Sequence, residues 1–274
     1  MAKQPVRGVR RINSGRGHRY TIDGKPAIGV TTALKALDKP ALASWSARTV
    51  AEYVADNIDG LLDRLYYAGG REPFIQHLRA IPNQKRNSAA SKGTSVHSVA
   101  DLIHKGEFED VPDDLAPYID AYLDFLSDFD AKVIHSEFVV AHRGLMYAGT
   151  GDSIIEVHHP DLSGTGLFDI KTGKGVYGDF ALQAAAYRFA EVMLIDGEER
   201  PMVPTDFAAV IHLSEEGYEV VPLRADEQAF EAFGKALWLW RNEMKQDYKT
   251  RKSPMDERVL PAIRPVMEPH EVSL

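Results

Sequence analysis

The sequence predicts an α/β protein with one mixed central sheet flanked by helices. Short apolar runs that are typical of strands lie near residues 133, 145, 166, 207 and 218. Stretches with apolar residues at helical spacing lie between and after these runs, as expected when helices pack against a sheet. The first 90 residues are mainly helical in pattern. We therefore expect an N-terminal helical region that closes over the functional site.

The N-terminal region, residues 1–90, starts with a basic stretch and a hairpin. Met1–Gly17 contains glycine and several cations, which indicates a mobile arm or a phosphate contact. His18–Val30 surrounds Asp23-Gly24, a common two-residue hairpin turn, so two short strands are expected there. Further along, helices are expected over 41–57, 61–67 and 72–81, and a polar loop over Pro82–Asn87.

The predicted core, residues 91–250, contains helices and strands, and a proline-rich tail follows at 251–274. The helix that leads into the core spans about 88–104, with apolar residues at helical spacing. Four prolines in the tail preclude regular structure. The other expected helices are 113–129, 179–195 and 226–248, and the expected strands are 132–140, 145–157, 166–171, 207–213 and 218–223.

Composition excludes several classes of protein. The chain has no cysteine, so disulfides, thiolate metal sites, a cysteine nucleophile and an iron–sulfur cluster are excluded. It has no apolar run of about 18 residues and no apolar N-terminal segment, so we expect a soluble, cytoplasmic protein without membrane contact. No Gly-x-x-x-x-Gly-Lys-[Ser/Thr] motif is present, and a nucleotide cofactor is not expected.

The charge of the chain is unevenly distributed. The formal net charge is −8, but residues 101–130 contain ten acids and one lysine, so the remainder sums to about +1. The first twenty residues carry six Lys or Arg and no acid. An acidic region beside a basic remainder is compatible with one-sided contact with DNA. Ordinary solvated charge explains the acidic stretch equally well.

Two acids and a lysine occupy the central apolar strands. Asp152 follows a Gly-Thr-Gly sequence in one strand, and Asp169, Ile170 and Lys171 end the next. Side chains alternate along a strand, so Asp169 and Lys171 share one face and Ile170 points to the other. Burial of such charges requires a partner, which a divalent cation held by the two acids would supply. Carboxylates are the ligands that Mg²⁺ and Mn²⁺ prefer, so metal-dependent phosphodiester hydrolysis is indicated, with Lys171 beside the attacking water.

Other polar residues are expected near these three. Gln183 and Tyr187 lie four residues apart in a predicted helix and therefore share a face. They could hold the lysine, the water or a phosphate. Glu137 lies in the strand 132–140, where alternation places it on one face with Val133, His135 and Val139.

The order of these motifs resembles the PD-(D/E)XK nuclease superfamily, and its RecB-like exonuclease branch in particular. The matching segments are Gly-x-Gly-Asp152, Asp169-Ile-Lys171-Thr, Gln183-x-x-x-Tyr187 and the upstream Ser91-Lys-Gly-Thr-Ser-Val-His97. The resemblance covers roughly Ser91 to Tyr187. Because cysteine is absent, the chain is similar to phage-type members that lack an iron–sulfur cluster.

The resemblance implies a restriction-endonuclease-like fold and a magnesium- or manganese-dependent deoxyribonuclease. It implies an exonuclease of DNA recombination, repair or replication that leaves a 5′-phosphate and works with a recombination or replication partner protein. The metal ligands would be His97, Asp152, Asp169 and the Ile170 carbonyl. Lys171 would be catalytic, with Glu137, Gln183 and Tyr187 in supporting positions.

Four cations are candidate contacts for the DNA backbone: Lys85, Arg86, Lys92 and Lys174. Two other functions remain open. One is a DNA-binding or assembly protein on a nuclease fold without activity, which the intact acid pair and lysine disfavour. The other is a metal-dependent phosphoesterase for a small substrate.

Overall fold

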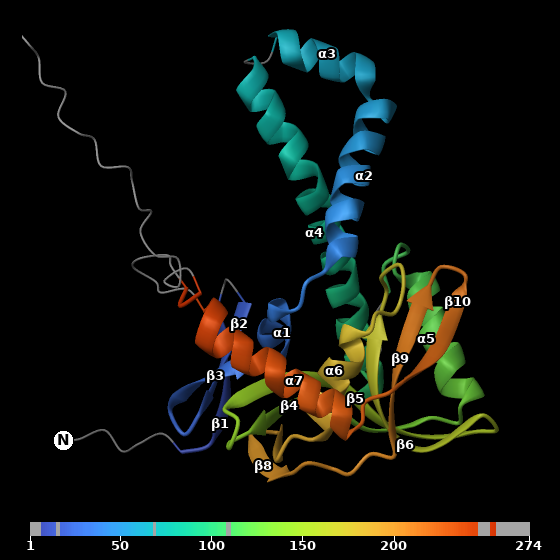
Figure 1. Cartoon of the computed structure of the whole chain (residues 1–274). Coiled ribbons are helices and arrows are strands. Elements are labelled where there is room, and N and C mark those ends of the chain that lie inside the picture. The colour runs from blue at the N-terminus through green and yellow to red at the C-terminus, as the bar shows by residue number, and fades with distance from the viewer. Residues whose placement is uncertain (1–6, 15–16, 68–69, 108–110, 246–252, 256–274) are drawn as a thin grey trace, which may run out of the picture.

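A ten-stranded mixed sheet with helices on both faces forms the body of the protein (Figure 1). The structure is a computed structural model and describes residues 7–14, 17–67, 70–107, 111–245 and 253–255. Within these residues there are seven α-helices. The predicted α/β class, with a mixed sheet flanked by helices, is therefore confirmed.

Strand β5 (Tyr147–His159) lies at the centre of the sheet. It pairs antiparallel with β4 (Lys132–His142) and with β6 (Leu162–Lys171). On the far side of β6, β9 (Phe207–Ser214) pairs in parallel with it, and β10 (Gly217–Leu223) pairs antiparallel with β9. These five strands correspond to the five apolar runs in the sequence, so those predictions are confirmed.

The N-terminal hairpin extends the sheet on the other side. Strands β2 (Gly17–Ile22) and β3 (Lys25–Gly29) form the predicted hairpin, and β3 pairs in parallel with the start of β5. The predicted mobile arm is wrong for β1 (Val9–Ser14), which pairs with β2 along its whole length. An edge strand buries few side chains, and here only Val9 is buried, so its composition resembles that of a loop. Residues 1–6 and 15–16 of the predicted arm lie outside the described residues.

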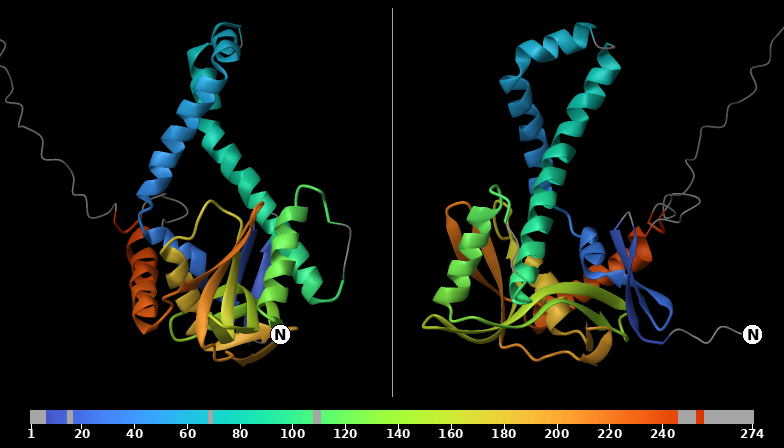
Figure 2. Two further views of the ribbon diagram at one scale, coloured as in Figure 1. Left: turned by 90° about the vertical axis from the view of Figure 1, so that its right-hand side faces the viewer. Right: turned by 180° about the vertical axis from the view of Figure 1, so that it is seen from behind.

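Three helices form an arm that projects from the body (Figures 1 and 2). Helix α2 (Pro40–Asp56) leads outward, α3 (Ile58–Tyr67) crosses at the tip, and α4 (Arg71–His104) returns to the sheet. Helix α4 is a single helix of 34 residues, so the predicted loop at Pro82–Asn87 is wrong. The boundary expected near residue 90 falls inside this helix.

The sequence conceals this long helix for two reasons. Residues 83–91 are all exposed, so no apolar periodicity marks them as helical. Pro82 suggests a break because proline lacks the N–H that a helix interior uses and clashes with the preceding turn. In the structure Pro82 is buried beside Ile81 within the helix, and the backbone continues as a helix on both sides.

Helices cover both faces of the sheet, so the sheet separates two parts of the core (Figure 2). On one face lie α5 (Ala116–Asp128) and the last turns of α4. On the other lie α1 (Val30–Ala33), α6 (Asp179–Arg188) and α7 (Glu227–Leu239). Alternation along β6 follows this division, because Phe168 and Ile170 pack toward α5 while Leu167 packs toward α6 and α7.

The segment after α6 differs from its prediction. The helix expected over 179–195 ends at Arg188, and β7 (Val192–Ile195) and β8 (Glu198–Pro201) follow as a hairpin. Its turn residues, Asp196 and Gly197, have φ of 51° and 82°, as a two-residue hairpin turn requires. A run of four apolar residues fits a strand as well as a helix. Here β4 offers an edge at Val139–Ala141, and pairing with it decides the outcome.

The C-terminal predictions are correct in part. Helix α7 begins one residue after the expected start, with Asp226 capping Ala229 N at 2.9 Å. It is followed by a π-helical turn at Trp240–Met244, and residues 246–248 of the predicted helix lie outside the described residues. Of the proline-rich tail, only Ser253, Pro254 and Met255 are described.

One glycine of β6 is required by close packing, and this gives a test of the fold. A methyl group at Gly166 would lie 2.6 Å from Phe168 Cε2 and closer still to Phe207. We expect Gly166→Ala to destabilise the protein by about 1–3 kcal/mol because both rings would have to move. The measurement is the urea midpoint of unfolding. Gly175→Ala is the control, since no atom lies within 4 Å of a methyl group there; equal midpoints for the two variants would contradict the described packing.

Candidate active site

The candidate site lies where β5 and β6 separate. Their pairing ends at Ser153 and Phe168, although β6 continues alongside β9 as far as Lys171. Beyond that last pair, the Ile170 N–H donates to Asp152 Oδ2 at 2.8 Å rather than to a strand carbonyl. The Asp152 carboxylate thus satisfies a backbone group that the sheet leaves without a partner.

The carbonyl of Ile170 receives donors from both faces of the sheet. His97, on α4, donates from Nε2 at 2.9 Å, and Lys171 donates from Nζ at 3.3 Å. A carbonyl oxygen only accepts, so Nε2 of His97 carries a proton. Its Nδ1 lies 3.4 Å from Asp152 Oδ2, which is also an acceptor. His97 is held between two acceptors, and this arrangement favours the imidazolium form.

Asp169 and Lys171 share the face of β6 that alternation predicts. The Lys171 ammonium is in direct contact with Asp169 Oδ2, and Asp169 is only 8% exposed. Gln183 Nε2 approaches Asp169 Oδ1 at 3.4 Å and lies 3.2 Å from the Tyr187 hydroxyl. Gln183 therefore positions Asp169. Tyr187 is 4% exposed, so the structure places it beneath the site rather than at its surface.

A group of three potential metal ligands lies beside this pair. One donor atom each from His97, Glu137 and Asp152 can be chosen so that all lie within 4.8 Å of one another. His97 and Asp152 belong to the set expected from the sequence, and Glu137 joins them. Asp169, the third expected ligand side chain, is instead in contact with Lys171.

Glu137 reaches this group through an irregular stretch of β4. The expected simple alternation from Val133 is wrong, because a bulge falls between Val133 and His135. Past the bulge, Ser136 pairs with Ser153, which places Glu137 opposite Asp152. Glu137 also has a φ of 48°, a rare conformation for a residue with a side chain. Strain of this kind is concentrated at functional sites.

Burial and mutual charge shift the pKa values of the four core groups. Burial alone would lower the pKa of His97, but the adjacent Asp152 carboxylate outweighs it and raises that pKa. Burial would raise the pKa of Asp152, yet His97 and Lys171 hold it below its usual range. For Asp169, burial and the charge of Asp152 raise the pKa to about 6. The pKa of Lys171 is raised because the two carboxylates outweigh its burial.

A cavity of about 930 Å³ opens onto His97 and Lys171. His97, Glu137, Ile170 and Lys171 contribute to its wall, together with Arg86 from α4. Glu137 has a raised pKa, chiefly because of burial and then the nearby Asp152 charge. The cavity therefore presents acids, an imidazole and cations in a single concave surface.

Arg11 is a wall residue that sequence reasoning did not single out. It lies on β1, lines the same cavity and has Nη1 4.0 Å from Glu137 Oε2. The basic composition of the N-terminal stretch indicated a phosphate contact, but no pattern separated Arg11 from its neighbours. Only the pairing of β1 with β2 fixes which cation faces the site.

The four predicted DNA contacts lie in different places. Arg86 lines the cavity, and Lys85 is its exposed neighbour on α4. Lys92 faces away, with Nζ 3.7 Å from Glu215 Oε1 and 4.9 Å from the centre of the Tyr118 ring. Lys174 is exposed in the loop after β6. The structure thus brings Arg86 into the candidate site and does not bring Lys92 there.

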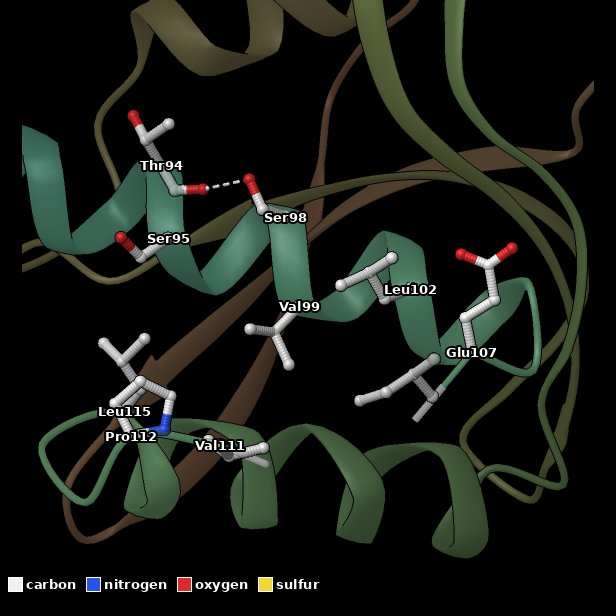
Figure 3. Close-up of a pocket in the computed structure, with 10 residues that line it drawn as sticks. Thr94, Ser95, Ser98, Val99, Leu102, Glu107, Val111, Pro112 and Leu115 are labelled. Atoms are coloured by element: carbon white, nitrogen blue, oxygen red, sulfur yellow. Dashed lines mark hydrogen bonds between the residues drawn. The ribbon is translucent and has the colours of Figure 1, made fainter. Parts of the chain in front are cut away.

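A smaller cavity of about 340 Å³ lies between the end of α4 and the start of α5 (Figure 3). Its wall is mainly apolar and includes Val99, Leu102 and Leu115. Ser98 donates to the Thr94 carbonyl at 3.0 Å, so its hydroxyl is satisfied within the helix. This cavity holds none of the candidate catalytic groups.

Comparison with known proteins leaves the family open. No protein-family model matches the chain, and no curated protein is similar enough to count as a relative. The fold and the site define a mixed α/β protein with a charged cavity where two core strands separate. Among the described helices, none has both the length and the apolar character of a membrane span.

Proposed function

We propose that this protein is a metal-dependent deoxyribonuclease of the PD-(D/E)XK type, in the RecB-like exonuclease branch. The observation that carries the proposal is the gathering of His97, Asp152 and Glu137 beside the buried Asp169–Lys171 pair, all at one break in the sheet. Carboxylates that could hold a metal ion, together with a lysine at a cavity wall, are groups that metal-dependent phosphodiester hydrolysis can use. The resemblance of the sequence motifs adds the branch, the role in DNA recombination, repair or replication, and the 5′-phosphate product.

The donor set of the site fits a magnesium or manganese ion. Asp152 and Glu137 offer carboxylate oxygens, the Ile170 carbonyl offers a neutral oxygen, and His97 offers a nitrogen once it is deprotonated. Both His97 and Lys171 direct N–H groups at the Ile170 carbonyl, so the site already stabilises positive charge at this point. Asp169 would complete the set if it released Lys171.

In this proposal the side chains of the site orient the reactants. A bound Mg²⁺ or Mn²⁺ would lower the pKa of a water molecule and offset negative charge on the phosphoryl oxygens. Asp169, held by Gln183, fixes the Lys171 ammonium at the edge of the cavity. From there Lys171 can donate to the attacking water or to a phosphoryl oxygen, which stabilises charge that develops in the transition state. Arg11 and Arg86 on the cavity wall are placed to neutralise neighbouring phosphates.

The expected result of a metal test is cleavage with Mg²⁺ or Mn²⁺ and none in chelator. Linear single-stranded and double-stranded DNA should lose nucleotides over time, whereas a closed circle should persist if the enzyme is an exonuclease. Ca²⁺ should support DNA binding with little cleavage, because it accepts looser coordination and polarises water less. Gel electrophoresis of 5′- and 3′-labelled substrates measures these outcomes.

Three results would replace the proposal. DNA binding without cleavage under every metal condition would favour the assembly protein on a nuclease fold. Hydrolysis of small phosphodiesters without attack on DNA would favour the small-substrate phosphoesterase. Full activity in chelator would exclude the metal site as described. Asp113→Asn changes an exposed acid that does not line the cavity of the candidate site, so it serves as the matched carboxylate control and should leave cleavage unchanged.

A further inference from the structure

A glycine-rich loop connects the candidate catalytic lysine to helix α6. The loop spans residues 172–178 and contains Gly173, Gly175 and Gly178. A methyl group at any of these three would meet no atom within 4 Å, so the loop is open to its surroundings. His212 Nε2 donates to the Gly173 carbonyl at 2.5 Å and anchors the end of the loop next to β6.

The other end of the loop is anchored next to the arm. Asp179, the first residue of α6, accepts a hydrogen bond from Lys39 Nζ at 2.6 Å. Lys39 immediately precedes α2. The loop is therefore held at both ends while its middle faces solvent, which suits a contact surface better than an unanchored loop would.

Tyr177 places a large exposed ring on this loop. Its exposed fraction is 55%, although a second aromatic ring lies next to it. The Phe180 ring is 5.8 Å from the Tyr177 ring in an edge-to-face arrangement, and Lys171 Nζ lies 5.2 Å from the centre of Phe180. The Tyr177 ring centre is thus no more than about 11 Å from the lysine, or about three nucleotides at 3.4 Å rise each.

Location distinguishes Tyr177 from the other exposed apolar residues. Of the described large apolar residues with high exposure, only Tyr177 and Trp238 are aromatic. Trp238 lies on α7, whereas Tyr177 lies in the loop whose first residues, Thr172 and Gly173, line the cavity of the candidate site. Single exposed apolar residues are normal on protein surfaces. Here the exposed ring is backed by a second ring, Phe180, which lies beside the half-buried Lys171, and this placement indicates a more specific use.

We propose that Tyr177 is a stacking platform for an unpaired base within about three nucleotides of the phosphate that is cleaved. Phe180 supports the ring from one side, and Lys174 in the same loop contacts the DNA backbone. Every base has a π-face, so such stacking tolerates any sequence. Inside a duplex, neighbouring bases cover these faces, and only a single strand or a frayed end presents one. The inference rests on the proposed nuclease function and deepens it, because it assigns single-stranded or frayed DNA as the substrate class.

The binding test compares Tyr177→Ala with two controls. Fluorescence anisotropy in Ca²⁺ measures the affinity for a labelled single-stranded oligonucleotide, so that cleavage does not interfere. We expect Tyr177→Ala to bind about tenfold more weakly, and Tyr177→Phe, which keeps the π-face, to bind within about twofold of the original. Trp238→Ala removes the other exposed aromatic and should change nothing. Tyr177→Ala should weaken the binding of a blunt duplex less than it weakens the binding of the single strand.

An abasic scan shows whether the lost contact is with a base. Removing the base at successive positions should reveal one position that weakens binding to the original protein about tenfold. With DNA that lacks the base at that position, Tyr177→Ala should cause no further loss of affinity, because the base that Tyr177 contacts is already absent. Equal affinity of Tyr177→Ala and the original protein, additive losses at every position, or no DNA binding by either would overturn the proposal.

The two proposals fail in different ways. Hydrolysis of a small chromogenic phosphodiester, which has no base to stack, should be equal for Tyr177→Ala and the original protein if Tyr177 acts only in binding. A loss of that hydrolysis in Tyr177→Ala would overturn the stacking role. Weaker binding by Tyr177→Ala in a protein that hydrolyses no phosphodiester would uphold the platform and refute the nuclease function.

Discussion

Lys171→Met should reduce DNA cleavage by about a thousandfold at saturating Mg²⁺. The ammonium group is held at the cavity edge by Asp169 and is the donor best placed to reach a phosphoryl oxygen or the attacking water. Loss of one such donor in a site shielded from water costs about a hundred- to a thousandfold in rate, and loss of proton-transfer assistance adds to this. Single-turnover kinetics with a labelled oligonucleotide measures the effect on the chemical step.

Loss of stability has to be separated from loss of chemistry in this variant. Lys171→Met leaves the Asp169 carboxylate buried without its cation, which destabilises a protein by about 3–5 kcal/mol. The double variant Asp169→Asn with Lys171→Met removes both charges and should recover most of this stability. It should remain inactive. Lys235→Met, a change at an exposed lysine that pairs with Glu231 and does not line the cavity, should retain the chemical step. Recovery of cleavage in the double variant would refute the role of Lys171.

His97→Gln should raise the Mg²⁺ concentration required for half-maximal cleavage by about ten- to a hundredfold. A ligand nitrogen must be free of its proton, yet the structure holds both nitrogens of His97 near acceptors and raises its pKa through Asp152. The metal and the proton therefore compete for His97. The metal requirement of the original protein should fall as pH rises through this raised pKa, and that of His97→Gln should be flatter. The expected increase in Mg²⁺ concentration matches the loss of metal affinity, about ten- to a hundredfold, that follows mutation of residues that support metal ligands.

The raised pKa of His97 also predicts how the stability of the metal-free protein depends on pH, which is measured in chelator. The folded protein binds a proton at His97 more tightly than the unfolded chain, whose histidines titrate near 6.5. This stabilisation is fully present below pH 6.5 and is lost as pH rises through the raised pKa. Asp169, with a pKa raised from 3.8 to about 6, gives the same sign at lower pH, so the range above 6.5 reports on His97.

Thermal unfolding in chelator provides the measurement. The midpoint should fall with rising pH above 6.5 in the original protein, and His97→Gln should remove that decline. His158→Ala is the histidine control, because the His158 side chain is exposed. Its Nε2 lies 3.8 Å from Glu156 Oε1. A decline of equal size in His97→Gln would place the titrating group elsewhere and leave His97 as a structural residue.

Local patterns in the sequence were sufficient to predict which side chains share a face at the centre of the site. Alternation along β6 placed Asp169 and Lys171 on one face, and their ion contact confirms this. Helical spacing placed Gln183 and Tyr187 on one face of α6, and their hydrogen bond at 3.2 Å confirms that as well. These features depend only on residues a few positions apart.

Features that depend on distant partners could not be predicted in the same way. The bulge in β4 that places Glu137 opposite Asp152 is a property of the ladder with β5. The position of Arg11 depends on an edge strand with only one buried residue, and β7 became a strand because β4 had a free edge. Exposed residues 83–91 conceal the continuity of α4, since nothing packs against them there.

That continuity gives α4 the mechanical properties of a lever. Its 34 residues span about 51 Å at 1.5 Å per residue. The pivot is at Val96 and Ala100, which are 0% and 1% exposed where the helix packs against the body. His97 sits at this pivot, while the other end of the helix meets α3 at the tip of the arm (Figure 1). Any tilt of the helix about this pivot would therefore reorient His97, which lies between Val96 and Ala100 along the chain.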